Sequence, residues 1–390
     1  MPPRTILITG KGGVGKTSVA AATARRLAAS GVETLIVSTD PAHSLGDVLQ
    51  AELAPEPRPV SERLHAQQVV AQAEMERHWA AVQDWLGDLL VRRGVDRISA
   101  EELTVPPGLD ELFSLLEIRR HHDEGRYEAI VVDCAPTGET LRLLSFPDVA
   151  RWWLEKAFPQ HSRLVAAARP FARALPDEQV LGDVQRLLHN LIAMNEILRD
   201  HEHVSVRLVL TPEQIVIDEA RRTFTYLSLY GFLTDAVIAN RVLPAEVDGY
   251  FGPWRERQAQ RLAEVERSFA PVPVLTAPFF AQEVCGEEML DRLGEALFAD
   301  ADPAAILHAS ITQELTVGAE HAELRLELPF ARKGEISVSK VGLELVIRVE
   351  GHKRTLALPP ALGDYRPTGA AFDDGALRVT FVRETATADV

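Results

Sequence analysis

The stretch Gly10-Lys11-Gly12-Gly13-Val14-Gly15-Lys16-Thr17 has the spacing G-x-x-x-x-G-K-T of a phosphate-binding loop, or P-loop. It follows the apolar run Ile6-Leu7-Ile8 and opens a helical pattern from about Lys16 to Ala29, which Gly31 terminates. A strand before the loop and a helix after it are the context that this motif requires. The stretch therefore predicts an α/β fold in which the edge of a parallel sheet binds phosphate.

The residues of this loop are the first candidate binding site. Glycines let the backbone wrap around a phosphate with its N–H groups pointing inward, and the N-terminus of the following helix adds its dipole. Lys16 is expected to contact the β- and γ-phosphates of a nucleotide, and the Thr17 hydroxyl to complete the shell of Mg²⁺. A glycine-rich turn without nucleotide is the disfavoured alternative. The sequence thus predicts a nucleotide and Mg²⁺ as cofactors, with these nucleotide-binding residues in the loop: Gly10, Gly12, Gly13, Val14, Gly15, Lys16, Thr17 and Ser18.

Two aspartates follow apolar runs and complete this predicted site. Asp40 comes after the run 34–37, and Asp133 comes directly after the run 129–132. Because the ends of parallel strands meet at one edge, Asp40 is expected to orient or deprotonate a water beside the γ-phosphate, and Asp133 to hold Mg²⁺ together with Thr17. Capping of the next helix is the alternative for Asp40. An ordinary turn between a strand and a helix is the alternative for Asp133.

The first 300 or so residues alternate short apolar runs with longer helical patterns, which is typical of a parallel sheet covered by helices. Residues 61–125 and 151–203 depart from this alternation, because their helical periodicity continues without an intervening strand. We therefore expect helical insertions there. Further strands are predicted at three apolar runs: 206–210, 236–239 and 272–275.

Beyond this α/β part, the pattern changes to the period-2 alternation of half-buried strands. Turn residues such as Gly334, Gly342 and Gly351 separate the alternating runs. The sequence therefore predicts a small all-β sandwich with a short loose tail, and it divides the chain into domains at 1–314 and 315–390. The expected strands of the second domain are 323–328, 335–338, 343–349, 354–358 and 376–381.

Composition and charge restrict the class of protein. The chain has 390 residues, of which 46% are hydrophobic and 25% are charged, as in a globular protein. Its net charge of -16 argues against a general binder of nucleic acid or anionic membranes. Two cysteines are too few for a disulfide scaffold, and neither a signal peptide nor an apolar stretch long enough to span a bilayer is recognised. We expect a cytoplasmic protein with at most an indirect association with membranes.

Three motifs, taken in order, are similar to those of a known family. They are the loop from Lys11 to Thr17, residues 38–45 (STDPAHSL) and residues 133–144 (DCAPTGETLRLL). Over about residues 4–300 the chain resembles the ArsA family of ATPases, which includes the ATPase of arsenite pumps and the ATPase that targets tail-anchored membrane proteins. The C-terminal part resembles the α-crystallin, or small heat-shock-like, domain of some bacterial and plastid relatives through these runs: 326–329 (LELP), 343–347 (LELVI) and 356–359 (LALP).

The resemblance implies further site residues. Lys11 matches the deviant Walker A group, in which this lysine crosses a dimer interface to the phosphates of the partner; a solvated surface lysine is the alternative. Asn240 matches the residue that reads the adenine edge, with a strand-end turn residue as the alternative, and Pro278 lies in the loop that flanks the adenine. The resemblance thus implies a homodimer with ATP at its interface. The catalytic residues would be Lys11, Lys16 and Asp40.

Two departures from the family concern cysteine. Cys285 has no C-x-x-C partner for the zinc that clasps the dimer of the eukaryotic targeting ATPase. Cys134 and Cys285 cannot reproduce the three-cysteine site of arsenite ATPases. Neither metal site is therefore expected. Cys134 is expected to be a buried core thiol, with a redox role as the alternative.

The insertions correspond to the client-binding region of the family. Trp152, Trp153, Phe158 and Phe171 either line a groove for a hydrophobic segment of a membrane protein or belong to ordinary core helices. The leading interpretation is an ATPase that binds and releases hydrophobic protein clients. The catalytic subunit of an arsenite or oxyanion efflux pump is the first alternative, and a holdase with a vestigial ATPase is the second.

Two histidine motifs have the composition of metal ligands. They are His121-His122 and His201-Glu202-His203. Neither has a supporting third cluster, so solvated helix or loop positions are expected for both.

Overall fold

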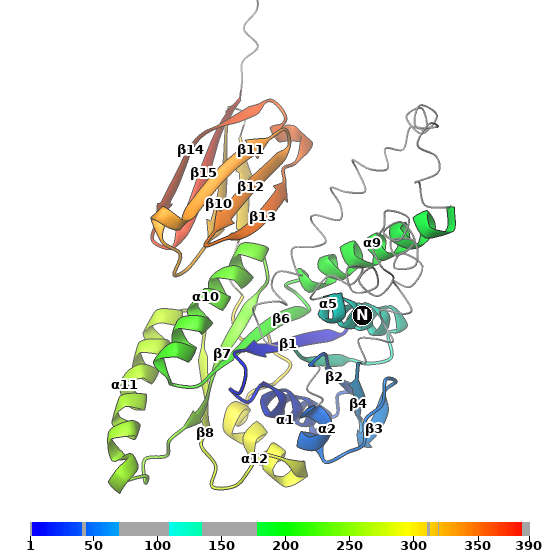
Figure 1. Ribbon diagram of the computed structural model, residues 1–390, viewed down its shortest axis with the longest axis vertical. Coiled ribbons are helices and arrows are strands. Elements are labelled where there is room, and N and C mark those ends of the chain that lie inside the picture. Colours follow the sequence, from blue (N-terminus) through cyan, green and yellow to red (C-terminus); the bar gives the residue numbers. More distant parts are fainter. Residues whose placement is uncertain are drawn as a thin grey trace, which may run out of the picture.

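In the computed structural model, the protein consists of a sheet covered by helices and a smaller β-sandwich (Figure 1). Parts of the family motifs at 38–45 and 133–144, namely residues 41–43 and 135–144, lie outside the described part of the chain, as do the aromatic residues named at positions 152–171. The structure describes the following residues: 2–40, 44–69, 109–134, 178–309, 313–318 and 320–383.

Among the described residues, eight strands form a mostly parallel sheet, as predicted. They are β1 (Arg4–Gly10), β2 (Thr34–Ser38), β3 (Arg58–Ser61), β4 (Leu64–Gln68), β5 (Ala129–Asp133), β6 (Val204–Leu210), β7 (Thr234–Val242) and β8 (Val274–Pro278). Their order is β3-β4-β2-β5-β1-β6-β7-β8, and only β3 and β4 pair antiparallel. Central strands such as β5 are buried along their whole length, which explains their continuous apolar runs.

Helices cover both faces of this sheet. They are α1 (Lys16–Ala29), α2 (Ser44–Leu49), α5 (Leu109–Glu124), α9 (Glu178–Leu198), α10 (Gln214–Tyr230), α11 (Gly252–Phe269), which follows the 3₁₀ turn η2 (Gly249–Phe251), and α12 (Gly286–Phe298). The helices α1, α2 and α12 pack on the face to which Ile6 and Ile8 point, and α5 and α9 on the face to which Leu7 points (Figure 1). The predicted end of α1 is confirmed, because Gly31 has a φ of 93°, which favours glycine.

The first predicted helical insertion is wrong at its start. Ser61 ends β3, and Leu64–Gln68 form β4 after a turn. The sequence of β4, LHAQQ, does not predict a strand, because two buried glutamines occupy positions where aliphatic residues are usual. Gln67 is satisfied there, since its amide donates to Glu117 Oε2 at 2.8 Å and to the Pro55 carbonyl at 2.6 Å. The helical prediction is confirmed for α5 and α9.

The expectation that His121 is solvated is wrong. Its side chain is 1% exposed between α5 and β4, and its Nε2 lies 2.6 Å from Gln67 Oε1. His121 follows the buried Glu117 by one helical turn, so both lie on the inner face of α5. Burial first, and then the positive charges of Arg120 and Arg126, lower the pKa of His121 to about 4. At neutral pH, His121 is thus a neutral group of the core.

Acidification is expected to destabilise the fold through His121. Because its folded-state pKa of about 4 lies below the ordinary value of 6.5, its stabilising contribution is complete above about pH 6.5 and is lost as the pH falls toward 4. The carboxylates of Glu117 and Glu124, at 3.8 and 3.6 Å from the ring, limit this loss. We expect the free energy of unfolding, measured with urea, to fall between pH 7 and pH 4 in both proteins. The fall should be about 3 kcal/mol smaller in His121→Gln than in wild type. The control variant His321→Gln, at an exposed position, should behave as wild type; equal losses in all three proteins would contradict this expectation.

The C-terminal residues form the predicted antiparallel sandwich. It contains β9 (Gln313–Val317), β10 (His321–Glu327), β11 (Ile336–Val341), β12 (Glu344–Val349), β13 (His352–Ala357), β14 (Tyr365–Asp373), β15 (Ala376–Arg383) and the 3₁₀ turns η3 (Lys333–Glu335) and η4 (Pro360–Leu362). In the described part, the sheets have the orders β14-β15-β10-β9 and β11-β12-β13. All five expected strands are present, and β9 and β14 join them. The expected boundary between residues 314 and 315 falls within β9, and the division of the chain stays a prediction.

The sandwich packs on the C-terminal half of α10 (Figure 1). Leu229 of α10 is fully buried among the core residues of the sandwich. The Thr225 hydroxyl donates a hydrogen bond to the Pro329 carbonyl, and the Arg354 guanidinium of β13 donates to the Leu229 carbonyl. The helix α10 is thereby held between the central sheet and the sandwich.

A buried ion pair anchors the segment that leads from α12 to the sandwich. Arg207 of β6 and Asp235 of β7 are both 0% exposed, with Nε and Oδ1 3.3 Å apart. The Arg207 guanidinium also donates to the carbonyls of Pro303 and Ala305, at 2.9 and 3.1 Å. Arg4 of β1 lies 3.3 Å from the other oxygen of the same carboxylate. The sheet thus holds this segment by charged groups rather than by apolar contacts alone.

Candidate functional site

The predicted site residues converge at the carboxyl ends of the parallel strands. The P-loop joins β1 to α1, Asp40 follows β2, and Asp133 ends β5. Asn240 lies near the end of β7, and Pro278 ends β8. Because these strands are neighbours in one parallel sheet, their carboxyl ends bring distant parts of the sequence to one edge.

The P-loop glycines adopt a backbone that side chains would disturb. A Cβ on Gly10 would collide with the carbonyl of Val209 on the neighbouring strand. Gly13 and Gly15 have φ values of 81° and 91°. A Cβ on Gly12 or Gly13 would meet no atom within 4 Å, so the loop leaves open space beside its backbone. This is what a phosphate cradle before a helix N-terminus requires, and the loop fits the expected ATP.

Lys16 and Thr17 begin α1 directly beside this space. Lys16 is 5% exposed, and its ammonium donates to the Lys11 carbonyl at 3.4 Å. The Thr17 hydroxyl lies 3.1 Å from the Ser44 hydroxyl of α2, and it is close enough to Asp133 to favour the charged form of that carboxyl group. A buried ammonium at a helix N-terminus creates a local preference for an anion, despite the negative charge of the whole chain.

Asp133 fits a ligand of a divalent cation. Its side chain is 0% exposed, Oδ2 accepts a hydrogen bond from Ser38 at 3.5 Å, and Oδ1 has no hydrogen-bond partner among the described residues. Burial raises the pKa of Asp133 to about 7, against the opposing effects of Thr17 and Lys16, and the charge of Asp40 adds to the rise. An orphaned carboxylate oxygen beside a hydroxyl is the donor set that Mg²⁺ prefers, so these residues fit the expected ion.

Asp40 lies close enough to Asp133 for its charge to raise the pKa of that carboxyl group. Its backbone N–H donates to the Ser38 hydroxyl at 3.3 Å, and its carbonyl accepts from the Gln68 amide at 3.2 Å. Because α2 begins only at Ser44, Asp40 does not occupy the N-cap position of that helix. The activation of water by Asp40 stays a prediction, and its capping alternative is weakened.

A cavity of about 660 Å³ adjoins the P-loop and has the size of a small-molecule site. Four of the predicted residues line it, namely Gly15, Ser18, Asn240 and Pro278. The segment 279–285 completes one wall and carries the half-exposed ring of Phe279. The structure therefore brings the predicted base-binding residues to the same cavity as the start of α1.

Asn240 and Arg241 reach from β7 to the P-loop. The register between β7 and β8 is irregular at this point, and Arg241 has a φ of 57°. Asn240 Nδ2 donates to the Val14 carbonyl at 2.8 Å, and Arg241 Nη1 donates to the Gly13 carbonyl at 3.0 Å. The irregularity thus aims both side chains at the loop. Asn240 lies within the strand rather than in a turn, and the role of Arg241 was missed because its sequence signal is only its place beside Asn240.

Lys11 is not a fully solvated lysine. Its side chain is 35% exposed, and Nζ lies 3.2 Å from Oε2 of Glu219 on α10. Sequence reasoning missed Glu219, as it missed Ser38 and Ser44, because a pairing between distant segments leaves no local pattern. Ser38 and Ser44 had one signal, since both lie in the motif STDPAHSL around Asp40.

The two cysteines have different surroundings. Cys134 is 3% exposed, and burial, followed by the nearby charge of Asp133, raises its pKa to about 12. It is a core thiol, as expected, because its reactive thiolate form is suppressed. Cys285 lines the cavity beside the P-loop, where its Sγ accepts a hydrogen bond from Gln50 Nε2 at 3.7 Å.

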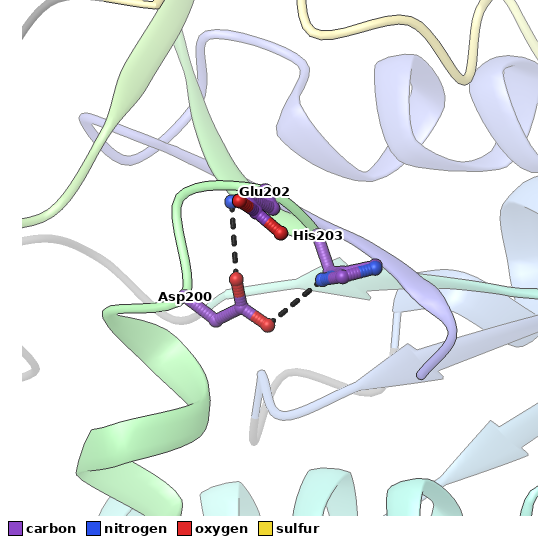
Figure 2. A group of neighbouring side chains, drawn as sticks. All are labelled: Asp200, Glu202 and His203. Carbon is purple, nitrogen blue, oxygen red and sulfur yellow. Dashed lines mark hydrogen bonds and ion pairs between the residues drawn. The ribbon is translucent and has the colours of Figure 1, made fainter. Parts of the chain in front are cut away.

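The turn between α9 and β6 gathers Asp200, Glu202 and His203 (Figure 2). Their potential ligand atoms lie within 4.8 Å of one another. Asp200 accepts from the backbone N–H of Glu202 at 3.0 Å and from Nδ1 of His203 at 2.8 Å. These bonds account for the turn without a metal ion. The expectation of solvated loop positions is confirmed for Glu202, which is exposed. His203 is only partly exposed and is held by Asp200, and the ring of His201 lies 2.9 Å from the Gly231 carbonyl.

Two family models match the two parts of the chain, and known proteins have similar sequences. A family model described as an anion-transporting ATPase matches residues 3–299, and a model described as an HSP20-like domain found in ArsA matches residues 319–381. A protein of Chlorobaculum tepidum named arsenical pump-driving ATPase is 37% identical over 97% of this chain and 96% of that protein. The protein of Aquifex aeolicus named arsenical pump-driving ATPase 1 is 34% identical over 94% of this chain and 97% of its own length. The ATPase get3 of Neurospora crassa is 30% identical over 75% of this chain and 90% of its own length.

No helix in the described part of the chain is both long and apolar enough to cross a bilayer. The matched family models cover the central sheet with its P-loop and the sandwich, respectively. The chain is therefore a member of the ArsA family of ATPases and combines the ATPase domain of that family with its HSP20-like domain.

Proposed function

We propose that this ATPase hydrolyses ATP between two copies of the chain and couples hydrolysis to the binding and release of a hydrophobic protein segment. One observation carries the hydrolytic part: the buried carboxylate of Asp133 is close to Thr17 and Lys16, and its Oδ1 has no hydrogen-bond partner among the described residues. The relation to the ATPase get3 proteins supports the client part. The cytoplasmic location stays a prediction from sequence.

The described residues divide the work on ATP among them. The P-loop amides and Lys16 would hold the β- and γ-phosphates and stabilise the charge that develops on them. Thr17 and Asp133 would hold Mg²⁺, which when bound offsets part of the phosphate charge. Asp40, beside Asp133, would orient the attacking water and accept its proton.

The adenine and the second copy involve other residues. Asn240 and Pro278 line the cavity beside Gly15, and an asparagine amide matches the donor and acceptor pattern of the adenine N6/N7 edge. Lys11 lies in the outer part of the P-loop with a partly exposed side chain. In the proposed dimer its ammonium would contact the phosphates bound by the partner.

A second candidate function is the ATPase subunit of an arsenical or oxyanion pump. Relatives in C. tepidum and A. aeolicus carry that name and match almost the whole chain. Both candidates use the same ATP site and differ in what stimulates hydrolysis. A holdase with a vestigial ATPase is disfavoured, because the buried ammonium of Lys16 and the buried carboxylate of Asp133 beside the P-loop support an intact site for ATP.

Replacing Asp40 by asparagine tests the hydrolytic assignment. Turnover, measured as phosphate release, should fall at least about 100-fold, because an amide cannot accept the proton of the water. Binding of ATP with Mg²⁺, measured by calorimetry, should persist. The control Asp300→Asn removes an exposed carboxylate after α12 and should retain wild-type turnover. Normal turnover in Asp40→Asn would mean that another group activates the water.

The same Asp40→Asn protein distinguishes the two candidate outputs. Held with ATP, it should retain a synthetic apolar peptide of transmembrane length and release it when ATP is replaced by ADP. A scrambled polar peptide is the control. Stimulation of wild-type hydrolysis by arsenite or antimonite, without retention of the apolar peptide, would favour the pump.

A further inference from the structure

An ion pair joins the P-loop to α10 within one chain. Nζ of Lys11 lies 3.2 Å from Oε2 of Glu219, and the two side chains are 35% and 30% exposed. The carbonyl of Lys11 meanwhile accepts a hydrogen bond from the buried Lys16 ammonium. The backbone of Lys11 thus belongs to the phosphate site, whereas its charge is paired with a helix of its own chain.

Glu219 lies on a helix that is packed on two sides. Its neighbours Ile217 and Ala220 are buried in the core beneath the central sheet. Further along the same helix, Leu229 is buried in the core of the sandwich. The long stem of Lys11 has more freedom than this helix, so opening the pair moves Lys11 rather than Glu219.

The pair competes with the interface role assigned to Lys11. One ammonium cannot contact the Glu219 carboxylate and the phosphates of a second chain at the same time. Nucleotide phosphates carry more negative charge than one carboxylate and accept charge-assisted hydrogen bonds from lysine. Lys11 therefore has two alternative anionic partners, one in its own chain and one in the proposed dimer.

We propose that Glu219 holds Lys11 on its own chain until a second copy presents nucleotide phosphates, so that breaking this pair opposes formation of the closed dimer. This rests on the proposed function, because it needs Lys11 at the interface. A partly exposed ion pair contributes little by itself, but a symmetric dimer must break two of them. Removal of the carboxylate should consequently favour the dimer, whereas loss of a residue that supports the closed site would weaken it.

The test compares full-length Glu219→Gln with wild type. Specific ATPase activity is measured against protein concentration, and the dimer fraction is measured by sedimentation with Mg²⁺ and a non-hydrolysable ATP analogue. We expect the concentration at half-maximal activity to fall about three- to tenfold, with the same maximal rate. Raising the NaCl concentration should narrow the difference between the two proteins. The control Glu266→Gln removes the same charge from an exposed position of α11 and should behave as wild type.

A second substitution of Glu219 extends the test. Glu219→Asp keeps the charge on a shorter stem and should lie between wild type and Glu219→Gln, which keeps the proposal testable if the glutamine variant does not fold. A half-maximal concentration that is unchanged or raised, at wild-type thermal stability, would overturn the proposal.

The Lys11→Ala variant shows whether a negative result concerns the pair between Lys11 and Glu219 or the proposed function itself. Normal dimerisation and hydrolysis in Lys11→Ala would refute the interface role of Lys11 itself. If Lys11→Ala loses hydrolysis, its dimer fraction should not change further when Glu219→Gln is added, because the two residues act through one contact. A full additional shift in the double variant would overturn the proposed pairing.

Discussion

Replacing Asp133 by asparagine is expected to lower Mg²⁺-dependent ATP hydrolysis at least about 100-fold and to stabilise the nucleotide-free protein at the same time. The first effect is expected because the substitution removes the charged oxygen that we propose holds Mg²⁺ together with Thr17. The second follows from burial: Asp133 is 0% exposed, its Oδ1 has no partner among the described residues, and burial raises its pKa to about 7. A neutral amide costs less to bury, so the free energy of unfolding should rise by about 1–3 kcal/mol.

Phosphate release and thermal unfolding measure the two effects on the same sample. Asp123→Asn, which removes a mostly exposed carboxylate from α5, is the control and should change neither quantity appreciably. Adding Mg²⁺ with a non-hydrolysable ATP analogue should raise the melting temperature of wild type more than that of Asp133→Asn. A variant that loses activity together with stability would show that Asp133 is a structural residue rather than a cation ligand.

Replacing Asp235 by alanine is expected to destabilise the chain by about 3–5 kcal/mol, the largest stability effect that we predict. Asp235 is 0% exposed and pairs with both Arg207 and Arg4, so its removal leaves the fully buried guanidinium of Arg207 and the mostly buried one of Arg4 without their carboxylate. Burial already lowers the pKa of Arg4 to about 10, an effect that Asp235 opposes. The backbone N–H of Leu307 would also lose its bond to Oδ2 of Asp235.

Urea unfolding gives the size of this loss, and limited proteolysis near residues 302–309 reports the release of the anchored segment. Asp291→Ala is the matched control, because it breaks an ion pair with Arg25 in which Asp291 is 55% exposed. We expect this control to lose less than about 1 kcal/mol. Equal losses of stability in the two variants would mean that burial does not increase the contribution of the ion pairs between Asp235, Arg207 and Arg4.

The fold could be predicted where local sequence and tertiary structure favour the same conformation. The P-loop glycines and the Ala-rich helix after them carry their conformation in their own sequence, and buried strands such as β5 are continuous apolar runs. The strand β4 was missed because Gln67 owes its burial to Glu117 and Pro55, which lie elsewhere in the chain. His121 was misplaced for the same reason, since its partner is Gln67.

The candidate site divides along a similar line. Lys16, Thr17, Asp40 and Asp133 could be proposed from sequence, because each stands at a fixed place relative to a strand end. Ion pairs and hydrogen bonds between distant segments could not be proposed from the sequence. Glu219 contacts Lys11 only because the strand order places α10 beside the P-loop, and no spacing in the sequence predicts that contact.

Leu229 belongs to the ATPase part by its place in the chain and to the sandwich by its packing. The two parts therefore cannot be exchanged between relatives as independent modules. A grafted sandwich would have to fit the surface of α10, and a shortened chain that ends after α12 would leave Leu229 in water. Substitutions on the two sides of this contact should accordingly have been selected together.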